Sequence, residues 1–280
     1  MDYQYLDENQ VAALLPDRSP EAHKGDFGRV LLLCGSRGYT GAAALAAMGA
    51  LRCGAGLVYL GVPESIYAIE AIKLTEPIVF PLPDRDGMLS EDAIPEIRAL
   101  LSRMDAVLIG CGLGVNQGTL AVLKMVLTEF SGTVIVDADG INLLAEHKDI
   151  LRGRTGSTIL TPHAGEFARL GYGGDRMLSA KQAAEELAAI LLLKGHHTVI
   201  TDGNCTYLNL TGNPGMATGG SGDVLAGMIS AFVGQGIAAL EATAMAAWLH
   251  GRAGDLCAEE LGQYAMLPSD MLEVLPRLMK

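Results

Sequence analysis

Short apolar runs that no polar residue interrupts recur along the 280-residue chain. Runs of this kind are typical of strands buried on both faces, as in a parallel sheet covered by helices. Helical stretches separate most of them, and this alternation predicts an α/β fold with a mostly parallel central sheet and helices on both of its faces. The expected strands are Arg29–Cys34, Gly56–Leu60, Ala106–Ile109, Thr133–Val136, Thr158–Leu160, Ile190–Lys194 and Thr198–Thr201.

The intervening and following segments have helical composition. A turn at Asp202-Gly203-Asn204 predicts that Tyr207–Leu210 returns antiparallel to Thr198–Thr201. The chain contains no internal repeat and no long linker, so we expect residues 1–280 to form a single domain. The expected helices are Gly41–Arg52, Glu91–Arg103, Thr119–Phe130, Ser179–Ala189, Asp223–Val233 and Leu240–Glu260.

Charge and composition exclude several classes of protein. The chain has 20 Lys and Arg against 32 Asp and Glu, a net charge of −12, whereas nucleic-acid grooves and basic membrane patches need clustered cations. Half of the residues are hydrophobic and 19% are charged, which excludes intrinsic disorder. An acidic, polar start and five scattered cysteines predict a cytoplasmic protein with reduced thiols and no membrane partner.

Glycine is in excess, at 35 of 280 residues, or about 12% against a usual value of about 7%. The glycines gather in loops that follow expected strands, at residues 35–38, 110–114 and 137–140. Because ligands bind at the carboxyl ends of parallel strands, we expect these loops to lie together at one edge of the sheet. Such loops indicate an enzyme built around a phosphate-bearing ligand.

The strongest signal is the glycine-rich segment 213–227, NPGMATGGSGDVLAG, which runs into a helix. Free N–H groups and the helix dipole form an anion site at such a junction. Asp223 falls in the first turn of this helix, where a carboxylate can accept a proton from a substrate hydroxyl. The alternative is that Asp223 only caps the helix.

Gly219–Asp223 resembles the G-x-G-D anion hole of the ribokinase-like superfamily, in which the aspartate is the general base of phosphoryl transfer. The whole 213–227 segment is similar to that of the ADP-dependent NAD(P)H-hydrate dehydratase family. Segments 25–43, 110–114, 136–144 and 161–167 agree with this family in the same order. The resemblance covers about Gly25 to Gly236 and implies a ribokinase-like fold.

The resemblance also implies a reaction. ADP phosphorylates the hydroxyl of the (6S)-hydrate of NADH or NADPH (NADHX or NADPHX), and elimination of phosphate restores NAD(P)H and leaves AMP. This makes the chain a carbon–oxygen lyase of nicotinamide-nucleotide repair, with Mg²⁺ neutralising the phosphoryl charge. Asp223 is then the catalytic base, and the Gly222 amide holds charge on the phosphate.

Substrate contacts follow from the same resemblance: Asp223 and His163, together with Ala42, Gly112 and Gly114. The small residues from Ala42 to Ala50 also suit close helix–sheet packing, and His163 can equally be a loop histidine with satisfied hydrogen bonds. The family string has proline where this chain has Cys111 and Ala164, next to the functional positions.

The nucleotide segment K-G-x-x-T of the family matches Lys194, Gly195, His196, His197 and Thr198, to which Gly222 is added. A plain hairpin turn with a solvated lysine is the alternative. Adjacent histidines without a second ligand cluster do not indicate zinc. Asp137, Asp139 and Asn142 can hold Mg²⁺ through water, or Asp139 can cap a helix near Gly140; we predict no direct metal ligand.

Two other functions share parts of this pattern: a kinase of a vitamin precursor, and a non-catalytic nucleotide-binding protein.

The resemblance further implies a homo-oligomer, specifically a tetramer. The long helix Leu240–Glu260 offers a surface for a second subunit, and we expect Trp248 of this helix to serve packing. Since few residues precede the first matching motif, we expect the NAD(P)H-hydrate epimerase to be a separate chain.

Overall fold

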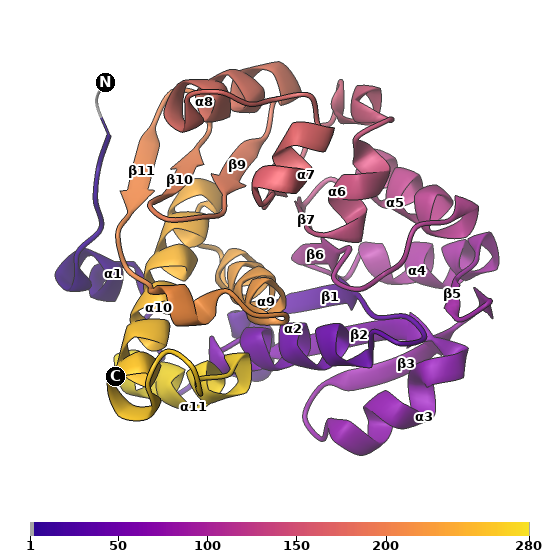
Figure 1. The fold of residues 1–280 in the computed structure, drawn as a ribbon. Coiled ribbons are helices and arrows are strands. Elements are labelled where there is room, and N and C mark those ends of the chain that lie inside the picture. The colour runs from indigo at the N-terminus through magenta and orange to yellow at the C-terminus, as the bar shows by residue number, and fades with distance from the viewer. Residues whose placement is uncertain (1–2, 280) are drawn as a thin grey trace.

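A nine-stranded sheet runs through the centre of the computed structural model, which describes residues 3–279 (Figure 1). Its strand order is β11-β10-β9-β8-β7-β6-β1-β2-β3. All neighbours from β9 to β3 pair parallel, whereas β10 pairs antiparallel with both β9 and β11, which confirms the expected hairpin. The strands are β1 (Arg29–Leu33), β2 (Leu57–Pro63), β3 (Ile78–Leu82), β6 (Ala106–Ile109), β7 (Thr133–Val136), β8 (Thr158–Leu160), β9 (Ile190–Leu193), β10 (Thr198–Thr201) and β11 (Thr206–Asn209).

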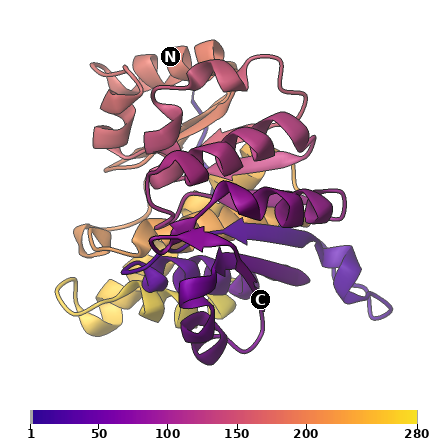
Figure 2. The same cartoon turned by 90° about the vertical axis from the view of Figure 1, so that its right-hand side faces the viewer.

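Helices cover both faces of the sheet, as the sequence predicts (Figures 1 and 2). Val30 and Leu32 of β1 pack in one hydrophobic cluster with α2, α9, α10 and α11, while Leu31 and Leu33 pack in the other with α4, α5 and α8. The helices are α1 (Glu8–Leu14), α2 (Thr40–Arg52), α3 (Glu64–Lys73), α4 (Ile94–Leu101), α5 (Gln117–Glu129), α6 (Asp139–Leu144), α7 (Ala164–Arg169), α8 (Arg176–Leu187), α9 (Ser221–Gly234), α10 (Ala239–Leu261) and α11 (Pro268–Leu278).

Several elements differ from the expectation. The helix expected over Glu91–Arg103 was wrong at both ends, because Glu91–Ala93 forms a 3₁₀ turn before Pro95 and α4 ends at Leu101. The edge strand β3 was missed because its sequence contains Pro81, which normally argues against a strand interior but is tolerated at a sheet edge. The other missed elements are α1, α3, α11 and the short hairpin β4 (Asp84–Arg85) and β5 (Met88–Leu89).

The helices α2 and α9 approach closely because glycine lies where they touch. A Cβ added to Gly227 of α9 would collide with the carbonyl of Ala46, and one added to Gly49 of α2 would lie 2.5 Å from the carbonyl oxygen of Val224. The small residues of α2 therefore serve close packing, but chiefly against another helix and not only against the sheet. This contact fixes the two helix N-termini relative to each other.

Trp248 of α10 is partly buried against the same cluster, in agreement with a packing role. The five cysteines are free thiols, and four of them are buried. Within residues 3–279 we find no helix with the length and apolar character needed to cross a bilayer.

We predict that Gly227→Ala lowers the free energy of unfolding by about 2 kcal/mol or more, because the added methyl meets backbone that cannot move alone. Gly41→Ala is the matched control, since Gly41 lies in α2 with no neighbour within 4 Å of an added Cβ; its effect should be neutral or stabilising by up to about 1 kcal/mol. Urea unfolding measures both. Equal losses in the two variants would show that the close contact of α2 with α9 does not limit stability.

Candidate active site

A cavity of about 960 Å³ opens at the carboxyl edge of the parallel strands. Its walls come from the ends of β7, β8 and β9 and from the glycine-rich segment before α9. The lining includes Asp137, Ala138, His163, Glu166, Lys194 to Thr198, Asn209 to Pro214, Met216 to Asp223, Leu225, Ala247, His250 and Gly251.

Hydrogen bonds join the three glycine-rich loops that the sequence places at one sheet edge. The Gly35 amide donates to the carbonyl of Cys111 (2.8 Å), and the Ser36 hydroxyl donates to the carbonyl of Gly112 (2.7 Å). The Gly114 amide donates to Oδ2 of Asp139 (2.9 Å). The predicted meeting of these loops is confirmed.

Asp223 is the third residue of α9, and it does not cap the helix. The cap is Gly220, whose φ of +100° favours glycine, and no side chain bonds the first-turn amides. Among residues 3–279 the amides of Gly222 and Asp223 have no acceptor. The capping alternative is therefore wrong, and free N–H groups face the cavity next to a carboxylate.

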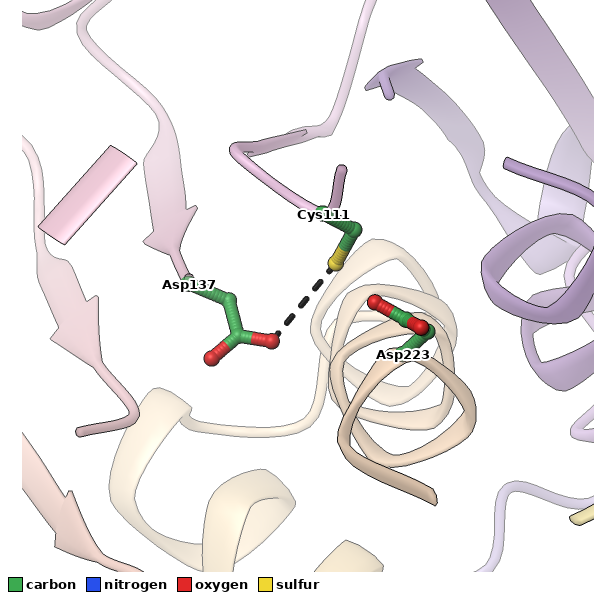
Figure 3. Close-up of side chains that lie close together, drawn as sticks. All are labelled: Cys111, Asp137 and Asp223. Atoms are coloured by element: carbon green, nitrogen blue, oxygen red, sulfur yellow. Dashed lines mark hydrogen bonds between the residues drawn. The ribbon is translucent and has the colours of Figure 1, made fainter. Parts of the chain in front are cut away.

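Asp223 lies close to a second acidic side chain and a thiol (Figure 3). Asp223, Asp137 and Cys111 bring one side-chain atom each within 4.8 Å of one another, and the Cys111 thiol donates to Oδ2 of Asp137 at 3.6 Å. Burial, followed by the charge of Asp137, raises the pKa of Asp223 to about 6, against opposing effects of Cys111 and Lys194. This carboxyl group can thus change protonation near neutral pH.

The Cys111 side chain stays a neutral thiol. A hydrogen bond with Cys34, and then burial, raise its pKa well above the ordinary value. Only the thiolate is an effective nucleophile or metal ligand. Cys111 therefore separates two carboxylates without adding a third negative charge.

Lys194 is largely buried, with 21% of its side chain exposed, and it is paired, so the alternative of a solvated turn lysine is wrong. Its Nζ lies 2.7 Å from Oδ1 of Asp137 and 4.0 Å from Oε2 of Glu166. Burial alone would lower the pKa of Lys194, but these two carboxylates outweigh it and raise the pKa. Thr161 also donates to Oδ1 of Asp137, at 2.6 Å.

The sequence did not predict the contact of Lys194 with Asp137. The residues are 57 positions apart, and no local spacing signals their contact. Only the strand order, which places β7 and β9 on either side of β8, brings their ends together.

His163 both caps α7 and lines the cavity. Its Nδ1 accepts the Gly165 amide (2.9 Å), while its own amide donates to Oε2 of Glu166 (2.8 Å). The imidazole remains 54% exposed. The two interpretations from sequence, a satisfied loop histidine and a substrate contact, are therefore compatible.

The turn after β9 forms another wall. The rings of His196 and His197 stack with centroids 3.8 Å apart, and His197 adopts a φ of +55°. The Thr198 hydroxyl donates to the carbonyl of Gly195 (3.0 Å). All five residues of the predicted nucleotide segment, and Gly222, line the cavity.

Ala42, Gly112 and Gly114 do not line this cavity. They gather beside it on the same sheet edge, where a Cβ on Gly112 would lie 2.8 Å from that of Ala42. A ligand that reached both places would have to extend along the edge past Asp139. Their substrate role remains a prediction.

Asp139 is the first residue of α6 and not its cap, so the N-cap alternative is wrong. The cap is Ala138, with a φ of +48°. The Asp139 carboxylate accepts the Gly114 amide, and Nδ2 of Asn142 donates to its other oxygen at 3.3 Å. Both carboxylate oxygens of Asp139 therefore already accept a hydrogen bond within the protein.

Comparison with known proteins agrees with this arrangement. The sequence profile of the NAD(P)H-hydrate dehydratase family matches residues 30–277. A bifunctional NAD(P)H-hydrate repair enzyme of Moorella thermoacetica is 45% identical over 95% of the chain and 52% of its own length. The chain thus spans about half the length of the curated relatives it matches.

Solved structures extend the likeness to the fold. An ADP/ATP-dependent NAD(P)H-hydrate dehydratase of Bacillus subtilis, co-crystallised with ATP/Mg²⁺, is 33% identical with a TM-score of 0.87, covering 99% of this chain and 98% of its own. A ribokinase-like superfamily protein of Enterococcus faecalis is 28% identical with a TM-score of 0.87, covering 99% and 95%. In sequence and in its ribokinase-like α/β fold, the chain belongs to the NAD(P)H-hydrate dehydratase family.

Proposed function

We propose that the protein catalyses the ADP-dependent dehydration of the (6S)-hydrates of NADH and NADPH, with release of AMP and phosphate. The observation that carries this proposal is a half-buried carboxylate, Asp223, with a pKa of about 6, beside the unpaired amides of Gly222 and Asp223 in the first turn of α9. A base and an anion site thus share one cavity, as transfer of a phosphoryl group to a hydroxyl requires.

In the first step Asp223 removes the proton of the substrate hydroxyl. The hydroxyl oxygen then attacks the β-phosphorus of ADP, and the bond from this phosphorus to the oxygen bridging to AMP breaks. The Gly222 amide donates to the transferring group, where negative charge is spread over the phosphoryl oxygens. A glycine at position 222 keeps the approach to this amide open, and an added Cβ would lie 3.3 Å from Nζ of Lys194.

In the second step the phosphorylated carbon loses its substituent. The ring nitrogen supplies the electron pair that expels phosphate, and the neighbouring carbon releases a proton to restore the ring double bond. Phosphate is a far better leaving group than hydroxide, so the first step makes this elimination possible.

Magnesium fits the chemistry of the site. Mg²⁺ prefers oxygen ligands, keeps several waters and usually binds through phosphates. Oδ1 of Asp137 is taken by Lys194 and Thr161, whereas Oδ2 accepts only the weak thiol bond of Cys111 and would be the oxygen of this residue to hold Mg²⁺ through water. When bound with the nucleotide, Mg²⁺ would supply neutralisation of phosphate charge.

We further propose residues 1–280 as one functional domain, active as a homotetramer in the cytoplasm. The continuous sheet and the free thiols support the domain and the compartment. A separate epimerase chain remains a prediction, because the curated relatives are named as bifunctional and are about twice as long.

Supplying NADPHX, ADP and Mg²⁺ tests the function. Return of absorbance in the reduced nicotinamide band, with stoichiometric AMP, is the expected result. ATP-dependent phosphorylation of a thiazole or pyrimidine alcohol without such recovery would instead identify a vitamin-precursor kinase. Nucleotide binding with neither reaction would identify a non-catalytic protein.

Asp223→Asn should lower kcat by about 10²- to 10⁴-fold, because an amide cannot take the proton. ADP should bind at least as tightly as to the wild type, since a neutral side chain does not repel phosphate. Asp149→Asn changes an exposed aspartate outside the cavity and serves as the control. Near-normal turnover of Asp223→Asn would remove the assignment of the base.

The pH dependence of kcat/KM should report the same group. Since a general base must be ionised, activity should fall as pH decreases through about 6, the pKa of Asp223. The residual rate of Asp223→Asn should lack this acidic limb. Steady-state rates between pH 5 and pH 8 measure it, and an identical limb in the variant would point to another residue.

Ionisation of Asp223 should also lower the free energy of unfolding. Because its folded pKa of about 6 exceeds the ordinary 3.8, its favourable contribution is complete below pH 3.8 and is lost as pH rises through 6. Asp223→Asn should therefore raise the free energy of unfolding at pH 8 by about 2 kcal/mol. The gain should shrink at pH 4, and denaturant unfolding at both pH values decides this.

A further inference from the structure

His250 is a buried titratable group that the proposed reaction does not use. It lies on α10, is 7% exposed and borders the cavity. Its Nε2 lies 2.9 Å from the carbonyl oxygen of Ser221, the first residue of α9, and 3.4 Å from the hydroxyl of the same residue.

The partner fixes the tautomer of the ring. A carbonyl oxygen only accepts hydrogen bonds, so Nε2 must carry the proton and donate it. Burial, followed by the nearby charge of Lys194, lowers the pKa of His250 to about 4, although the bond to Ser221 opposes this shift. The ring is therefore neutral at physiological pH and acts as a constant donor rather than as an acid or base.

The peptide bond between Ser221 and Gly222 connects the hydrogen bond of His250 with an N–H group at the cavity. This bond is trans, and in a trans peptide the C=O and the following N–H point in opposite directions. A donor that holds the Ser221 oxygen on one side thus aims the Gly222 N–H toward the other. Hydrogen bonds in a chain also polarise one another, which makes this N–H a stronger donor.

The helix start depends on outside support because it has no side-chain cap of its own. Gly220 offers no capping oxygen, and within the described chain the amides of Gly222 and Asp223 stay unpaired, whereas the Ser221 amide donates to the carbonyl of Thr218 at 3.4 Å. The same helix α10 also holds the segment leading to α9, since Asp255 accepts the amide of Gly212 (3.0 Å) and Nδ2 of Asn213 (3.1 Å).

We infer that His250 is a positioning residue that orients and polarises the Gly222 amide for the phosphate of a nucleoside diphosphate. The inference rests on the proposed function only in that it takes ADP as the ligand. The role that we infer for His250 is exerted through the Ser221–Gly222 peptide and requires no contact of His250 with the phosphate or with the substrate hydroxyl.

His250→Phe removes the donor and keeps a ring of similar size, while His250→Gln places an amide nitrogen near the position of Nε2. Thr243→Val is the control, because Thr243 is a buried residue of α10 whose hydroxyl donates to the carbonyl of Ala239 outside the cavity. Calorimetric titration with ADP and Mg²⁺ should give a Kd about tenfold higher for His250→Phe. His250→Gln should lie within about threefold of the wild type, and Thr243→Val should match it.

Two readouts separate positioning from general destabilisation. In His250→Phe the ¹H resonance of the Gly222 amide should move upfield, and kcat should fall while KM for the hydrate stays constant. Equal ADP affinity in all variants, or a loss that His250→Gln does not restore, would overturn the inference. ADP binding that follows the expected series without recovery of NADPH would contradict the dehydratase function and leave the role of His250 standing. Failure of the wild type to bind ADP would contradict both.

Discussion

The site depends on one electrostatic constraint: the buried carboxylate of Asp137 and the half-buried carboxylate of Asp223 lie close together, and only Asp137 is paired with a cation. Lys194 lies against Asp137, so the charge of Asp137 is compensated while that of Asp223 is not. Burial, and after it the charge of Asp137, makes ionisation of Asp223 unfavourable, so Asp223 keeps its proton to higher pH. A single lysine thus pairs with Asp137 and leaves Asp223 as the carboxylate whose pKa is raised.

Packing on one face of the sheet supports this arrangement. The helix α9, which carries Asp223, packs between the sheet, α2 and α10. The glycine at its contact with α2 sets how close the helices lie, and His250 of α10 holds its first turn. Asp137 follows the end of β7 and Lys194 follows the end of β9, so these strands position the two side chains at the cavity. The geometry of the cavity is therefore set by the hydrophobic core and not by the loops alone.

The sequence predicted the fold class, the main strands and the meeting of the glycine-rich loops, because buried parallel strands and positive-φ glycines leave local signals. It missed β3, whose Pro81 is allowed only by its place at the edge of the sheet. It also missed the pairing of Lys194 with Asp137 and of His250 with Ser221. Such contacts depend on strand order and helix packing, which no short window of residues contains.

In the function that we propose, phosphate recognition by backbone amides lets a chain with a net charge of −12 bind a polyanion next to a base. An arginine or a free lysine at the same place would attract phosphate more strongly, but its charge would also lower the pKa of Asp223. Neutral N–H groups at a helix start attract the anion with only partial charges. Among residues 3–279, Lys194 is the lysine that lines the cavity, and it is already bound to Asp137. In the proposed reaction the carboxylate of Asp223 therefore remains basic enough to take a proton while the phosphate is held beside it.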